Sequence, residues 1–268
     1  MIADLQRREY EIATAYDAGF HVPKIQYLGD KTLTEIDEIE LDKNWEVVDR
    51  KLAIEVMEGI TCSFVAFYNG KDFSFNTVLI NDNYLLGGCQ GVRLPANAVT
   101  AFPGKSKKIN NILVKLSEKF MDKEDFTGFV TLDVTFQEDK VYYHRIKFNI
   151  LYDYLHAISA LSNMSVDSLL KTMESGESIE KPEGYGCSLR LWEYPYGQHN
   201  KIIAEPYVED HGLQEIEDCY VITSTGKTIK KAWKSLYRKA KDIEMCYRLD
   251  GDYKARWTYN QLKQNHYV

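Results

Sequence analysis

Alternating apolar and polar side chains mark two hairpins along the chain. In ITCSFVAFYNGKDFSFNTVLI, residues 60–80, two alternating runs flank Asn69-Gly70, a dipeptide typical of tight hairpin turns. In FVTLDVTFQEDKVYYHRIKFNI, residues 129–150, two further strand-like runs flank a turn-like segment. Both segments are therefore predicted to form pairs of antiparallel strands.

A different periodicity predicts the helices. Apolar residues recur at helical spacing in residues 3–18, 108–121, 152–162, 166–174 and 227–243. Ser165 is suited to cap the fourth of these helices and Gly176 to end it. The glycines and prolines of residues 81–107 predict a long loop, whereas CSLRLWEYP and DCYVITSTG predict strands. Because hairpins outnumber βαβ units, the pattern predicts an α+β fold.

Composition narrows the class of protein. The chain has 268 residues, of which 44% are hydrophobic and 27% charged, as in ordinary folded proteins. Its net charge of −7 argues against a general nucleic-acid binder. The five cysteines are scattered and lack metal-binding spacing, so reduced thiols and a cytoplasmic location are expected. No apolar run approaches the ~20 residues that span a membrane, and the first residues do not resemble a signal peptide.

The second hairpin has an unusual polar face. A three-residue loop at 138–140 would set Asp133 opposite Arg145 and Thr131 opposite Lys147. The face is then a solvated surface with a salt bridge worth roughly 0–1 kcal/mol, or an anion-binding platform. On this register Val130, Leu132, Val134 and Phe136 face Tyr142, His144, Ile146 and Phe148, and the other face gathers Thr131, Asp133, Thr135, Arg145, Lys147 and Asn149.

Residues 227–241 are strongly basic. They contain seven lysines and arginines and no carboxylate. The cations form either a solvated helix face or a surface for an acidic partner.

Five segments in the same order resemble the ATP-grasp superfamily. IEVMEGITCSFVAFYNGKDF is similar to its "IEEFLEGEEASV…DG" signature, and GFVTLDVTFQEDKVYYHRIKFNI to its metal-binding hairpin, which ends in "LEINVR". SALSNMSVDSLLKTMESGE resembles the helix that follows. EGYGCSLRLWEYPYG and VITSTGKTIKKAWKSLYRKAKDIEMCYRLD resemble the C-terminal part of the phosphoribosylamine–glycine ligase family. The resemblance covers about residues 50–250.

The resemblance implies a nucleotide site and an activity. Such enzymes phosphorylate a carboxylate with ATP, and an amine then displaces the phosphate, with Mg²⁺ bridging the phosphates. The resemblance places the adenine against Glu55, Val56 and Met57, and the first metal carboxylate at Asp133. It also implies a partial ATP-grasp fold with an antiparallel sheet and flanking helices, followed by a small C-terminal α/β subdomain.

The chain departs from the pattern where the metal should bind. The family's metal-binding glutamate falls at Arg145, its asparagine at Lys147, and the second glutamate of "GEE" at Thr61. Arginine has only donors and keeps its proton, so it cannot ligate Mg²⁺, although it suits phosphate. A cation would be repelled here, and Arg145 with Lys147 would instead bind an anion or pair with Asp133.

The segment before residue 50 is short for the lobe that grips the phosphates in the family. The predicted organisation is a truncated N-terminal segment at 1–50, an ATP-grasp-like half-module at 51–180 and a C-terminal subdomain at 181–268. Two functions remain open. One is a degenerate, non-catalytic binding or structural module, and the other is a carboxylate–amine ligase completed by a partner protein or by a second copy. A nucleotide such as ATP is the expected ligand, with Mg²⁺ disfavoured.

Overall fold

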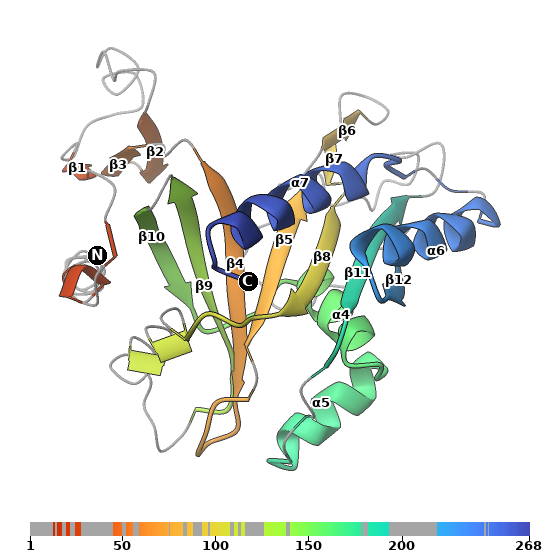
Figure 1. The fold of residues 1–268 in the computed structure, drawn as a ribbon, viewed down its shortest axis with the longest axis horizontal. Helices are drawn as coiled ribbons and strands as arrows, with labels where there is room; N and C mark the ends of the chain where they lie inside the picture. The colour runs from red at the N-terminus through yellow and green to blue at the C-terminus, as the bar shows by residue number, and fades with distance from the viewer. Residues whose placement is uncertain are drawn as a thin grey trace. The chain divides into compact units, whose positions relative to one another are not determined.

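The computed structural model divides into two compact units, and Figure 1 labels the strands and helices of both. Unit 1 comprises Met1–Thr61 and Leu132–Ile146, and unit 2 comprises Cys62–Thr131 and Lys147–Val268. The structure describes most of residues 59–137, 140–192 and 219–268, and before these only residues 13, 15–17, 20–21, 25–27, 45–49 and 52–55. The predicted helices at 3–18 and 108–121 lie largely outside the described residues.

Seven strands form one sheet in the order β10-β9-β4-β5-β8-β11-β12, and helices flank it. Its β4–β5, β5–β8, β8–β11 and β11–β12 pairs are antiparallel, which confirms the predicted α+β class. Two smaller sheets have the orders β1-β3-β2 and β6-β7. The strands are β1 Ile25–Tyr27, β2 Trp45–Asp49, β3 Leu52–Glu55, β4 Ile60–Tyr68, β5 Thr77–Asp82, β6 Leu85–Gly87, β7 Arg93–Pro95, β8 Ala98–Pro103, β9 Gly128–Gln137, β10 Lys140–Lys147, β11 Tyr185–Trp192 and β12 Cys219–Gly226, and the helices are α4 Tyr152–Leu161, α5 Val166–Glu174, α6 Ile229–Lys241 and α7 Gly251–Gln264.

The prediction of a long loop at 81–107 is wrong. The segment contains β6, β7 and β8, and β8 pairs with β5 on one side and β11 on the other. Residues 98–102 are all buried, because helices cover both faces of the sheet in unit 2. Such a strand has no polar alternation, and the nearby glycines and prolines concealed it.

The first predicted hairpin is confirmed, with a wider turn than expected. Tyr68 bridges to Phe73, so the turn contains residues 69–72 and not Asn69-Gly70 alone. The Asn69 side chain closes the turn by accepting hydrogen bonds from the backbone N–H groups of Lys71 and Asp72, at 2.9 and 2.8 Å. This side-chain turn replaces the two-residue turn typical of Asn-Gly.

Helices cover both faces of the sheet in unit 2. Helices α4 and α5 pack on one face over Val99 and Ala101, and α6 and α7 pack on the other over Cys187 and Leu189. The caps agree with the predicted boundaries, since Ser165 Oγ accepts from the Ser168 N–H at 3.1 Å. None of the described helices is both long and apolar enough to cross a membrane.

A buried ion pair fastens α4 to the sheet. The Nε and Nη2 atoms of Arg190, in β11, donate to the two carboxylate oxygens of Asp153 at 3.1 and 2.8 Å. Arg190 is 0% and Asp153 1% exposed. Asn97, directly before β8, also donates to Asp153 at 2.6 Å, and Ser188 Oγ donates to the Asp153 carbonyl oxygen at 2.8 Å. One carboxylate therefore joins α4 to two neighbouring strands.

Removing this carboxylate will test its contribution to stability. Asp153→Ala leaves the Arg190 charge buried without its carboxylate, so the free energy of unfolding should fall by about 3–5 kcal/mol in urea titrations. Asp167→Ala is the matched control, because Asp167 lies in the first turn of α5 but is exposed. The control should lose less than about 1 kcal/mol. Equal losses in the two variants would contradict the assignment.

The histidine one turn along α4 predicts a pH dependence. Burial lowers the pKa of His156 below its ordinary value of 6.5, while Asp153 raises it and Arg190 lowers it. Below pH 6.5 the unfolded chain therefore binds the proton more readily, and the free energy of unfolding should fall as the pH falls. His156→Gln should flatten this slope in urea titrations at a series of pH values. If the substitution left the slope unchanged, the pH dependence of the free energy of unfolding would come from titratable groups other than His156.

Candidate functional site

The predicted nucleotide and anion residues fall on different parts of the structure. Glu55 is the last residue of β3, whereas Val56 and Met57 lie outside the described residues. Arg145 lies in the part of β10 that belongs to unit 1, and Lys147 ends β10 in unit 2, where it is half-buried. The adenine contact and the two-cation clamp therefore remain predictions.

Asp133 and Arg145 form the expected ion pair. Arg145 Nε donates to Asp133 Oδ2 at 2.9 Å, with side-chain exposures of 44% for Arg145 and 15% for Asp133. The predicted facing of these two residues is thereby confirmed. An ion pair this exposed contributes only about 0–1 kcal/mol, so a competing anion can recruit the guanidinium at small cost.

The hairpin has a shorter loop than predicted, although Asp133 and Arg145 still face each other. Strand β10 begins at Lys140, so only two residues separate it from β9, and a two-residue loop alone would reverse the facing. The buried side chains of β10 are Val141, Tyr143 and Ile146, which breaks the strict alternation of a strand between 143 and 146. We infer from this burial pattern that β10 carries one extra residue here, as in a β-bulge. The bulge restores Arg145 to the face of Asp133.

The face predicted for His144 is wrong. Its Nε2 atom lies 2.6 Å from Thr135 Oγ1, so His144 shares the polar face and not the apolar one. Thr135 Oγ1 in turn lies 3.0 Å from the hydroxyl of Thr61 in β4. The shared face follows from the bulge, which turns two consecutive residues outward. The sequence gives no spacing signal for a contact between Thr61 and Thr135, which are 74 positions apart.

A glycine sets the close approach of β4 to β9. Gly59, directly before β4, has φ +153°, and a Cβ added there would lie 2.4 Å from the carbonyl oxygen of Phe136. Another side chain at this position would push the start of β4 away from β9. The motif glycine therefore positions Thr61 beside Thr135.

The polar face does not suit Mg²⁺. Asp133 and Arg145 occupy the two positions where the resemblance implies metal-binding carboxylates, and only Asp133 is a carboxylate. That carboxylate is already neutralised by Arg145. Over the part of the chain that the structure describes, no three His, Cys, Asp or Glu side chains gather as a metal site. Mg²⁺ needs several hard oxygen ligands, so the donor set favours an anion.

Comparison with solved structures identifies the fold. Phosphoribosylamine–glycine ligase from Thermotoga maritima is similar with a TM-score of 0.59 and 15% identity, over 91% of this chain and 78% of that one. Phosphoribosylglycinamide synthetase from Anaerococcus prevotii gives 0.53 and 12%, over 90% and 74%. The phosphoribosylaminoimidazole carboxylase ATPase subunit from Aquifex aeolicus gives 0.51 and 13%, over 86% and 69%. No protein-family model and no curated protein sequence matches the chain.

The fold is thus the α+β fold of the ATP-grasp ligases, and it resembles that of phosphoribosylamine–glycine ligase over nine-tenths of this chain. At these identities the likeness establishes the fold alone. The function of the protein depends on the particular residues that this chain carries.

Restoring the acidic pattern tests whether position 145 decides cation binding. The double variant Arg145→Glu with Lys147→Asn places a second carboxylate beside Asp133, and we expect it to bind Mg²⁺ more tightly than the unaltered chain does. The gain should appear in calorimetry and as a Mg²⁺-dependent rise in Tm. Arg256→Glu on α7 is the control, because it changes the charge beside Asp252 without touching the hairpin. Equal gains in both would mean that net charge alone attracts the ion.

Proposed function

We propose that this protein is a non-catalytic, ATP-grasp-like binding module that takes a phosphate-bearing ligand without a divalent metal. The observation that carries the proposal is the ion pair between Asp133 and Arg145, at the position where the resemblance implies a metal-binding glutamate. An arginine in place of a carboxylate changes the local charge by two units. The same position that would hold a cation is thereby made attractive to an anion.

The chemistry of the surrounding face supports phosphate as the ligand. Arg145 is accessible to solutes, and its planar guanidinium matches two phosphate oxygens at once. The hydroxyl of the exposed Thr61 and the half-buried His144 ring belong to the same polar face, joined through Thr135. Hydroxyl and imidazole groups donate hydrogen bonds to phosphate oxygens. Lys147 is the second cation that the sequence predicts for this ligand.

A nucleotide is the phosphate compound that the fold favours. N5-carboxyaminoimidazole synthase from Aspergillus clavatus, whose structure holds ADP and an aminoimidazole ribonucleotide, has a TM-score of 0.50 and 13% identity to this chain. Glu55 with Val56 and Met57 is the segment that the resemblance assigns to the adenine. We therefore expect ATP or ADP to bind through the phosphates, with Mg²⁺ adding nothing.

An active carboxylate–amine ligase, completed by a partner protein or a second copy, is the alternative. The similar structures, which are named ligases and synthetases, favour it. It requires Mg²⁺ at the nucleotide phosphates. The two functions therefore differ in whether the metal strengthens nucleotide binding.

Thermal shift measurements separate the two functions. With millimolar ATP, ADP or tripolyphosphate and excess chelator, Tm should rise by a few degrees, as binding to the folded state requires. Arg145→Gln should remove the rise. Arg256→Gln is the matched control, since Arg256 also pairs with an aspartate, at 3.0 Å, and is 45% exposed. A rise seen only with Mg²⁺ would support the ligase, and no rise with any of these compounds would overturn both.

A further inference from the structure

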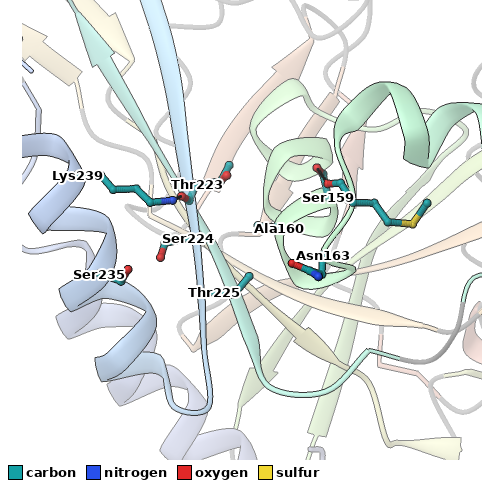
Figure 2. A pocket seen from close by; sticks show the side chains of 9 residues that line it. Ser159, Ala160, Asn163, Thr223, Ser224, Thr225, Ser235 and Lys239 are labelled. Carbon is teal, nitrogen blue, oxygen red and sulfur yellow. Dashed lines mark hydrogen bonds between the residues drawn. The ribbon is translucent and has the colours of Figure 1, made fainter.

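The outer edge of β12 borders a polar groove in unit 2 (Figure 2). β12 is the last strand of the seven-stranded sheet, and the cavity along it has a volume of about 390 Å³. Ser159 and Asn163 line it from α4 and the turn that follows, and Ser235 and Lys239 line it from α6. The edge of the strand therefore lies between two helices that cover opposite faces of the sheet.

The backbone of β12 presents hydrogen-bonding groups to this groove. Lys239 Nζ donates to the carbonyl oxygen of Thr223 at 2.8 Å, so this carbonyl points away from β11. The carbonyl of the next residue, Ser224, instead accepts from the Sγ of Cys187 in β11 at 3.4 Å. In an antiparallel strand both groups of one residue point the same way, and alternate residues share a direction. The N–H and C=O groups of Thr223 and Thr225 therefore face the groove.

Charge is distributed unevenly around the groove. Lys231, Ser235 and Lys239 follow one another at four-residue spacing, so they lie along one side of α6. Between residues 227 and 241 the chain has seven cations and no carboxylate. The α4 side of the groove is neutral, with Ser159, Asn163 and Thr223. The lining therefore carries one cation, Lys239, on the α6 side, with further lysines along that helix, and its α4 side is uncharged.

We propose that this groove binds an extended acidic segment of a partner protein, which adds to the sheet as a strand beside β12. None of the described strands pairs with the outer edge of β12, so its backbone groups can bond to an added strand, as in other cases of strand addition. Because side chains of a strand alternate between its faces, acidic residues at every second position would all point toward Lys239 and α6. The intervening small side chains would lie against α4.

The same charges disfavour a second copy of this chain as the occupant. Pairing of β12 with itself would bring two copies of α6, each with six lysines and arginines, to the same edge. Like charges placed together cost free energy, and none of the residues of β12 itself is charged to offset them.

Peptide binding to the full chain tests the proposal. The probe is a fluorescein-labelled seven-residue peptide that alternates Glu with Val or Thr, measured by fluorescence polarisation at about 50 mM salt, where charge attraction is weakly screened. We expect saturable 1:1 binding. A peptide of the same composition with its glutamates in one block should bind at least about tenfold more weakly, and so should one with Lys in place of Glu.

Two pairs of variants separate strand addition from simple charge attraction. Thr225→Pro removes the N–H that faces the groove, and proline is tolerated on an edge strand, whereas Thr225→Val keeps this N–H. Lys239→Glu reverses the charge at the groove, whereas Lys230→Glu makes the same change elsewhere on the exposed surface of α6. Thr225→Pro and Lys239→Glu should each weaken binding about tenfold, and the two controls less than about threefold.

Several results would overturn the proposal. They are no binding of the alternating peptide up to about 1 mM, equal binding of the alternating and block peptides, or full binding by Thr225→Pro. If Thr225→Pro does not fold, as judged by circular dichroism, the contrast between Lys239→Glu and Lys230→Glu decides alone. Self-association of the unaltered chain that Thr225→Pro abolishes would assign the groove to a second copy, and it would equally overturn the proposal.

Discussion

The buried pair of Asp153 and Arg190 is the constraint on which the architecture of unit 2 depends. A charged arginine with no solvent exposure is compatible with a stable fold only when a carboxylate meets it with good geometry, and here both carboxylate oxygens accept from it. Asn97 and Ser188 add two more hydrogen bonds to the same aspartate. Helix α4 is thereby fixed in position over β11 and the start of β8, and its far end forms one wall of the groove beside β12.

The exposed pair of Asp133 and Arg145 has the opposite character. It contributes little to stability, because solvent screens it, so separating the two side chains costs little free energy. In a hairpin with the acidic pattern of the ATP-grasp ligases, the same strand positions would gather a cation. An arginine there gives the same strand positions a group that can bind phosphate but cannot ligate Mg²⁺.

Much of the fold could be read from local patterns. Alternation identified β4 and the β9–β10 hairpin, helical spacing identified α4, α5 and α6, and the order of motifs indicated the fold that the structural comparison confirms. Strand β8 was not predicted, because a strand covered by helices on both faces has no alternation of apolar and polar residues. Only part of the candidate site could be predicted from the sequence. The facing of Asp133 and Arg145 followed from pairing, whereas the bulge that makes it possible depends on which residues of β10 the core buries.

The sequence by itself determined the charges of this protein, namely an arginine where the resemblance implies a metal-binding glutamate, and seven cations with no carboxylate between residues 227 and 241. Only the tertiary structure decided which of these charges meet a partner. Asp153 and Arg190 are 37 positions apart, and no periodicity links a residue at the start of a helix to one in a later strand. Likewise β12 is an edge strand only because of its place in the sheet. Long-range contacts of this kind arise from the packing of whole elements, and local spacing does not encode them.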